Sequence, residues 1–326
     1  MKRIYGIDLS KDKFDVNYLD PEGISKHLIV GNTFNGICKF LGSIPKEVVL
    51  VAEHTGVYGN LLVFLANQLG IKICLSSGYT IKHSLGLTRG KSDKYDAFRI
   101  REYGERFYDK LQEVRTDSEH MVELNELYAL RNQLVKERKM LLTHQSSKSQ
   151  GVMNSVAVHR TATRMICNFN ESIDELEQQM MDIICSDDEL KRTYALTTSV
   201  KSVGTVTACE LIIKTGNFKR INTARKASSY AGVCPFPNES GNMVHKSKLS
   251  PMSDKRLKTL LFMCARTAVK YNKDFKHYYE KKQNQGKHHY LIMNNIANKL
   301  LRTIFSVIES GKPWDPNYIC LDPRNV

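Results

Sequence analysis

The sequence lacks the features that would place the chain in a membrane or in an oxidising compartment. No apolar run in its 326 residues approaches the roughly 18–20 residues that a transmembrane helix needs. The N-terminus has no apolar signal-peptide segment, so we expect a cytoplasmic protein. The eight cysteines are scattered without a C-x-x-C pair, which favours reduced thiols over a disulfide framework or a zinc site. No segment has the P-loop spacing G-x-x-x-x-G-K-[ST], so nothing indicates nucleotide hydrolysis.

Acidic residues are scarce in only one half of the chain. From residue 201 onward there are 22 Lys and Arg but only 8 Asp and Glu, which accounts for the whole net charge of +14. The first 200 residues are therefore neutral overall. A basic half of this kind indicates that the C-terminal region binds a polyanion, with nucleic acid favoured over an anionic membrane because no basic amphipathic anchor is present.

The length of the chain predicts more than one domain. Residues 1–110 alternate strand-like and helix-like patterns, which predicts a mixed α/β domain. Its first two strands are expected to form a hairpin, and an apolar helix is expected over residues 57–69. The expected strands are 3–9, 14–19, 27–30, 47–53 and 72–75, and the other expected helices are 33–41 and 93–106.

The middle and C-terminal regions have helical periodicity instead. A capping box at Thr116–Glu119 starts a long amphipathic helix, and a second such helix follows a polar stretch at 145–163. Residues 111–186 are thus predicted to form a helical arm, either a hairpin or an intermolecular coiled coil. Residues 187–326 are predicted to form a mainly α domain, with an irregular loop at 235–251. Its expected helices are 205–215, 223–232, 254–271 and 291–310.

Four carboxylates occupy positions from which they can hold metal ions. Asp8 and Glu53 each end an apolar strand, and Asp93 and Asp96 are three residues apart on an expected helix, so that they share one face. Four clustered carboxylates repel one another unless divalent cations lie between them, and Mg²⁺ or Mn²⁺ prefers such oxygen ligands. Two such ions can activate a nucleophile and stabilise a leaving oxygen in phosphoryl transfer.

The segments that carry these carboxylates resemble a known family. G-I-D-L-S-K, A-E-H-T-G-V-Y and K-S-D-K-Y-D-A are similar to the RuvC-like domain of the DEDD insertion-sequence transposases. The resemblance implies a ribonuclease-H-like fold, with Asp8, Glu53, Asp93 and Asp96 as catalytic metal ligands.

A second resemblance lies in the expected loop of the basic half. S-Y-A-G-V-C-P…S-G…K-L-S…R-L-K is similar to the C-terminal transposase domain of the same family. The resemblance implies that Ser240, the serine of the S-G pair, is a nucleophile that attacks a DNA phosphodiester. Read by itself, Ser240 is a polar loop residue with a flexible glycine neighbour, and only His245 is a candidate general base.

The resemblance also implies partners and an activity. We expect a site-specific DNA recombinase of an insertion sequence, associated with the nucleoid, acting with a structured guide RNA from the element and working as a homodimer or tetramer. The alternatives are a Holliday-junction-type metal-dependent endonuclease, in which Ser240 is incidental, and a non-catalytic nucleic-acid-binding protein. Basic residues and a helix-start glycine are the candidate nucleic-acid contacts: Lys201, Gly204, Lys219, Arg220, Arg225, Lys226, Lys246, Lys248, Lys255 and Arg256.

Overall fold

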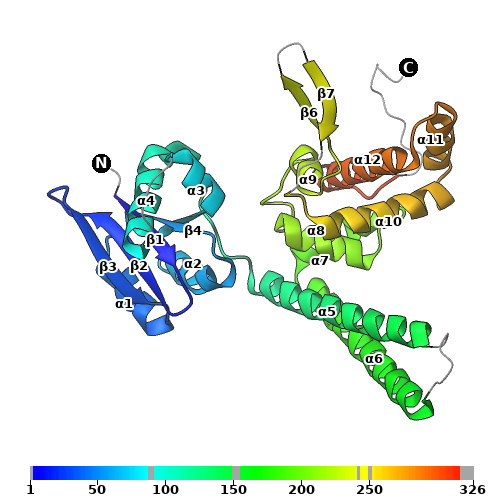
Figure 1. The fold of residues 1–326 in the computed structure, drawn as a ribbon, viewed down its shortest axis with the longest axis horizontal. Helices are drawn as coiled ribbons and strands as arrows, with labels where there is room; N and C mark the ends of the chain where they lie inside the picture. Colours follow the sequence, from blue (N-terminus) through cyan, green and yellow to red (C-terminus); the bar gives the residue numbers. More distant parts are fainter. Residues whose placement is uncertain (1–2, 87–91, 149–154, 241–242, 249–251, 316–326) are drawn as a thin grey trace. The chain divides into compact units, whose positions relative to one another are not determined.

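The computed structural model describes residues 3–86, 92–148, 155–240, 243–248 and 252–315 (Figure 1). The chain divides into two compact units, Met1–Thr116 and Asp117–Val326. Within the described residues, no helix combines the length and apolar character needed to cross a membrane.

The first unit is a mixed five-stranded sheet with helices on both faces. The strand order is β3-β2-β1-β4-β5, in which β1, β2 and β3 pair antiparallel while β1, β4 and β5 pair parallel. The expected hairpin and the expected mixed α/β character are both confirmed. In chain order the elements are β1 (Ile4–Leu9), β2 (Lys13–Leu19), β3 (Ser25–Gly31), α1 (Phe34–Ser43), β4 (Val49–Glu53), the 3₁₀ helix η1 (Gly56–Gly59), α2 (Asn60–Gln68), β5 (Lys72–Ser76), α3 (Gly78–Ser84), α4 (Asp93–Arg106) and the 3₁₀ helix η2 (Tyr108–Lys110).

The two faces of this sheet carry separate cores. Ile7, Phe14 and Val16 are fully buried against apolar side chains of α1 and α2 on one face. Ile4 and Val51 belong to the core on the other face, which α3 and α4 cover. The division follows from the alternation of side chains along each strand.

The second unit is mostly helical. Its elements are α5 (Glu119–Lys148), α6 (Val156–Ser186), α7 (Asp188–Ser199), α8 (Thr205–Thr215), α9 (Ala224–Tyr230), β6 (Phe236–Ser240), β7 (Met243–Lys248), α10 (Lys255–Tyr271), α11 (Lys273–Asn284) and α12 (His289–Ser310). Helices α5 and α6 lie side by side as a hairpin (Figure 1), tied by Arg131 to Glu177 at 2.6 Å. Leu124 of α5 and Ile184 of α6 are fully buried in the core that α8, α10 and α12 also share, so the base of the arm packs with the C-terminal helices.

Two expectations about local structure are wrong, and a third is confirmed with a different start. The region 235–251 contains the antiparallel hairpin of β6 and β7 instead of an irregular loop, with a register shift between Phe236 and Asn238. The residue at this shift is Pro237, which has no backbone N–H to donate to the neighbouring strand. Because a proline argues against a strand, the sequence pattern did not predict one here. The polar stretch 145–163 is largely helical, and Gln145 of α5 donates to Thr163 of α6 at 3.1 Å. The segment 57–69 is helical as expected, but its first turn is the 3₁₀ helix η1, and α2 follows directly.

Candidate active site

The sheet register places two of the candidate carboxylates at the same edge. Ile7 of β1 is paired with Ala52 of β4 in a parallel ladder, so Asp8 and Glu53 each follow one residue further along adjacent strands. Side chains alternate along a strand, and Asp8 therefore shares the face of Ile4 and Gly6, beneath α4. Glu53 shares the face of Val51 in the same way. Both carboxylates accordingly lie on the face that α3 and α4 cover, at the carboxyl ends of parallel strands, where open α/β sheets commonly bind ligands.

Gly6 brings α4 directly onto this face. A Cβ at Gly6 would collide with the carbonyl oxygen of Ala97 and the backbone nitrogen of Arg101. Only glycine permits so close an approach between strand and helix. One turn before Ala97, the first turn of α4 carries both Asp93 and Asp96.

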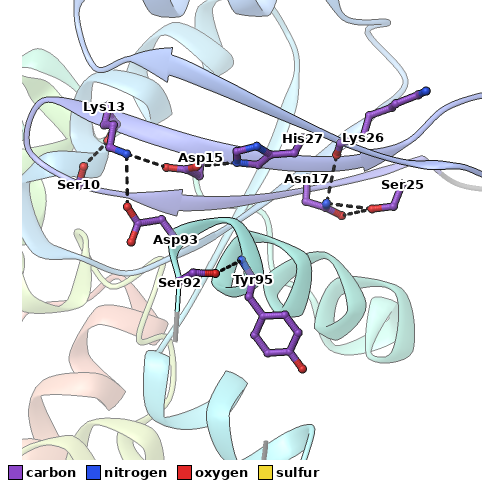
Figure 2. Close-up of polar contacts among 10 residues, drawn as sticks. All are labelled: Ser10, Lys13, Asp15, Asn17, Ser25, Lys26, His27, Ser92, Asp93 and Tyr95. Carbon is purple, nitrogen blue, oxygen red and sulfur yellow. Dashed lines mark hydrogen bonds and ion pairs between the residues drawn. The ribbon is translucent and has the colours of Figure 1, made fainter. Parts of the chain in front are cut away.

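The start of α4 is fixed by a side-chain cap. The Ser92 hydroxyl accepts a hydrogen bond from the backbone N–H of Tyr95 at 3.3 Å, as Figure 2 shows. The cap determines where the helix begins, and it therefore places Asp93 and Asp96 in the first turn. Strand β1, strand β4 and helix α4 thus deliver the four candidate ligands to one region of the first unit.

The electrostatics of Asp8 show that these groups act on one another. The pKa of Asp8 is raised from 3.8 to about 6, first by burial and then by repulsion from Asp96, Glu53, Asp93 and Asp15. Desolvation and like charges both disfavour the ionised carboxyl. A bound cation near Asp8 would remove this penalty.

The sequence interpretation missed a charged group on β2. Asp15, which is 4% exposed, is paired with Asp8 in the ladder and is bonded to His27 Nε2 at 2.6 Å. The Lys13 ammonium contacts Asp15 at 3.5 Å and Asp93 at 3.4 Å, and Figure 2 shows it between the two carboxylates. Fully buried Phe14 and Val16 alternate with these residues, so period-two alternation in K-F-D-V-N was the available signal.

The four candidate carboxylates are chemically suited to a hard divalent cation, although their side chains do not converge on one point. Among the residues that the structure describes, no three His, Cys, Asp or Glu side chains converge closely enough to enclose a metal ion. The Glu53 carboxylate occupies the position that a Cβ on Gly78 would take. All four candidates nevertheless offer only carboxylate oxygens, and after burial their negative charges are the main cause of the raised pKa of Asp8.

Ser240 lies in the other unit. It is the last residue of β6 and is paired with Met243 of β7, next to the hairpin turn. Gly241 of the S-G pair and Leu249 of K-L-S fall outside the described residues. The carboxylates and the serine therefore belong to different units of the chain.

The candidate nucleic-acid contacts differ in how they are engaged within the second unit. Lys219 is paired with Glu189 at 2.8 Å, and Arg220 with Asp117 at 3.5 Å. The Arg256 guanidinium is paired with the buried Glu210 at 3.4 Å and donates to Asn132 of α5 at 2.5 Å.

Lys246 and Lys248 belong to β7, of which only the backbone is described, and the other candidates are exposed. Lys201 lies over the Trp314 ring at 5.6 Å and lines a cavity of about 750 Å³ beside α12. Gly204 is the N-cap residue of α8 and provides no side-chain cap. Arg225, Lys226 and Lys255 are also exposed.

Two family models match the chain, one over the segments that carry the carboxylates and one over the segment that carries Ser240. A DEDD transposase model of the IS110 type matches residues 5–149, and a model described as the transposase IS116/IS110/IS902 family matches residues 194–280. The carboxylates lie in the first matched region and Ser240 in the second.

Curated relatives match along nearly the whole chain. The pilin gene-inverting protein of Moraxella bovis is 27% identical over 96% of this chain and 98% of its own length. The transposase for insertion sequence element IS1328 of Yersinia enterocolitica is 24% identical over 94% of this chain and 97% of its own length. These matches define the class of the protein, a DNA transposase or recombinase. The chain belongs to the DEDD family of insertion-sequence transposases, which its own motifs resemble.

The charge distribution predicts salt-dependent DNA binding through the second unit. Replacing exposed Arg225 and Lys226 by Gln is expected to reduce the slope of log affinity against log salt by about 1–2, because each phosphate contact releases about one counterion. The slope is obtained from the affinity of the full chain for duplex DNA, measured at salt concentrations from about 50 to about 300 mM. The matched change Lys46→Gln, at an exposed site of the first unit, should leave it unchanged. A slope that is reduced by Lys46→Gln but unchanged by the Arg225 and Lys226 substitutions would contradict DNA binding through the second unit.

Proposed function

We propose that the protein is a site-specific recombinase that moves an insertion sequence by metal-assisted transesterification. The observation that carries the proposal is the placement of Asp8, Glu53 and the Asp93–Asp96 pair on one face of the sheet, where burial and then repulsion among these carboxylates raise the pKa of Asp8. Their order on β1, β4 and a later helix supports a ribonuclease-H-like, RuvC-like domain. Membership of a transposase family supports DNA as the substrate.

The four carboxylates are the proposed ligands of Mg²⁺ or Mn²⁺. When bound, the metal supplies activation of the nucleophile and stabilisation of the leaving oxygen. Lys13 neutralises part of the excess negative charge through its contacts with Asp15 and Asp93. The Ser92 cap and the close contact at Gly6 hold Asp93 and Asp96 on the same face as Asp8.

Ser240 is the proposed nucleophile. Its hydroxyl oxygen forms a bond to the phosphorus of a DNA phosphodiester, one ester bond to a sugar oxygen breaks, and the departing oxygen takes up a proton. One phosphoester replaces another, so strands can be exchanged without ATP. Basic residues of the second unit hold the backbone phosphates.

The family resemblance supports two further parts of the proposal. A structured RNA from the element pairs with donor and target DNA, and the basic second unit provides a surface for it. The chain works as a multimer in which the carboxylates of one subunit act with Ser240 of another. The α5–α6 arm is the proposed dimerisation element.

A reconstituted exchange reaction tests the proposal. The full chain is co-expressed with the flanking sequence of its own element, and the RNA that co-purifies is sequenced. We expect one element-derived RNA, and recombinant joints between donor and target DNA that disappear after RNase or EDTA treatment. Cutting without rejoining, independent of RNA, would show a structure-selective nuclease instead.

A further inference from the structure

The hairpin that carries Ser240 is connected to the helical core of the second unit at two points, and these two points contact each other. Residues 230–235 lead into β6, and the described chain resumes at 252–254 before α10. A two-stranded hairpin is marginally stable in isolation. Its direction relative to the helical core therefore depends on the contacts at these two points, which we call the first foot (230–235) and the second foot (252–254).

Hydrogen bonds fix the first foot to α9 and α12. The backbone N–H of Val233 donates to the Ser228 carbonyl at 3.0 Å, and the side-chain amide of Asn294 donates to the Val233 carbonyl at 2.8 Å. Gly232 has φ +64, and a Cβ there would lie 2.6 Å from the Cβ of Ser253 in the second foot. The two feet are therefore in direct contact.

Asp254 joins the second foot to the first and to α8. Its backbone N–H donates to the Tyr230 carbonyl at 2.8 Å. Its two carboxylate oxygens have different partners: Oδ1 accepts from the backbone N–H of Leu257 at 2.8 Å and caps α10. Oδ2 accepts from the Tyr230 hydroxyl at 3.3 Å and is paired with Lys214 Nζ at 3.3 Å.

Lys214 and Asp254 form an ion pair in which each residue stabilises the charged form of the other. Burial disfavours the charged form of Lys214, but Asp254, Tyr230 and Glu210 together outweigh it, so the pKa of Lys214 is raised. Burial likewise opposes ionisation of Asp254, yet the Leu257 N–H and Lys214 together lower its pKa. The Asp254 side chain is only 14% exposed, which limits screening by solvent.

We propose that Tyr230, Asp254 and Lys214 are positioning residues that set the direction of the β6–β7 hairpin and thereby place Ser240 for attack. Ser240 lies six residues beyond Cys234, a distance of up to about 20 Å along an extended strand. A rotation of about 5° at the feet moves the end of such a strand by more than about 1 Å, and a misplacement of that size can cost about 100-fold in rate. The inference rests on the proposed role of Ser240.

Two substitutions remove the Oδ2 contacts without removing the helix cap. Tyr230→Phe deletes only the hydroxyl, and Asp254→Ser keeps an oxygen that can cap α10. Lys214→Arg retains the ion pair and serves as the conservative rescue. Tyr279→Phe is the matched control, because its hydroxyl is bonded to His289 on the α11–α12 side of the unit.

The full-length variants are compared in hydrogen–deuterium exchange, DNA affinity and the single-turnover rate of strand exchange. For Tyr230→Phe and Asp254→Ser we expect faster exchange of the amides of 236–248, unchanged protection of α8 and α12, DNA affinity within about twofold of wild type, and a rate lowered about 10- to 100-fold. Lys214→Arg and Tyr279→Phe should behave like wild type.

The inference is overturned if the hairpin amides of both variants exchange at the wild-type rate, or if they exchange faster while strand exchange keeps its rate. A uniform loss of protection and of DNA affinity would also overturn it, since that is general destabilisation. Ser240→Ala is run in parallel. Retained strand exchange in that variant would refute the proposed nucleophile, whereas the amide exchange of 236–248 reports on the feet of the hairpin independently.

Discussion

Ser240→Ala is expected to abolish strand exchange, with a loss of at least about 10⁴-fold, because no other group is proposed to form the covalent bond to DNA phosphorus. Binding of DNA should remain within about twofold of wild type, since a serine contributes little to phosphate affinity compared with the basic residues. Exchange of end-labelled DNA measures the loss. Denaturing gels of the same reactions should show a protein–DNA adduct for wild type and none for the variant.

Ser247→Ala provides the control for this change, because it removes a hydroxyl from β7 of the same hairpin and should leave exchange intact. Retained exchange by Ser240→Ala would refute the serine mechanism. If Ser240→Ala and Asp8→Asn both leave every DNA transaction unchanged, the protein binds nucleic acid without catalysing its rearrangement.

Asp8→Asn is expected to remove activity while making the metal-free protein more stable. The folded-state pKa of Asp8 is about 6, raised from 3.8 by burial and then by neighbouring carboxylates. Because the folded pKa is the higher one, the stabilising effect of protonation is present below about pH 4 and is lost as the pH rises through 6. At pH 7 the ionised carboxylate therefore costs stability, by about 1–2 kcal/mol once solvent screening is allowed for.

Thermal unfolding between pH 4 and pH 8 measures this effect. The Tm of wild type in EDTA should fall relative to that of Asp8→Asn as the pH rises from 4 to 7, leaving the variant a few degrees more stable at pH 7. Adding Mg²⁺ should raise the Tm of wild type and have a smaller effect on the variant. Asp109→Asn, at an exposed site of the same unit, should change neither activity nor Tm. A lower Tm for Asp8→Asn at pH 7 would contradict the electrostatic account.

The positions of the candidate carboxylates on strands and helix were predictable because each depends on local pattern. Asp8 and Glu53 end apolar strands, and the three-residue spacing of Asp93 and Asp96 is a helical one. The structure confirms strand ends for the first pair and the first turn of α4 for the second. Local patterns also gave the antiparallel hairpin of β1 and β2.

Contacts between distant segments were not predictable in this way. The ion pair of Lys13 with Asp93 joins β2 to α4, and these two residues are 80 positions apart in the sequence. The β6–β7 hairpin was missed because Pro237 and polar residues interrupt the alternation that identifies strands. Arg256 reads as a free basic residue, yet the fold pairs it with the buried Glu210.

By itself the sequence determined the charge asymmetry and the residue types available to hold a metal, since these follow from composition and short motifs, and its resemblance to the transposase family implied Ser240 as the nucleophile. The tertiary structure alone decided which face those carboxylates share, because that depends on the pairing of Ile7 with Ala52 and on the close approach of α4 at Gly6. It also decided that Tyr230, Asp254 and Lys214 meet beneath the Ser240 hairpin. Such contacts form only when α8, α9 and α10 pack together, and no local propensity encodes that packing.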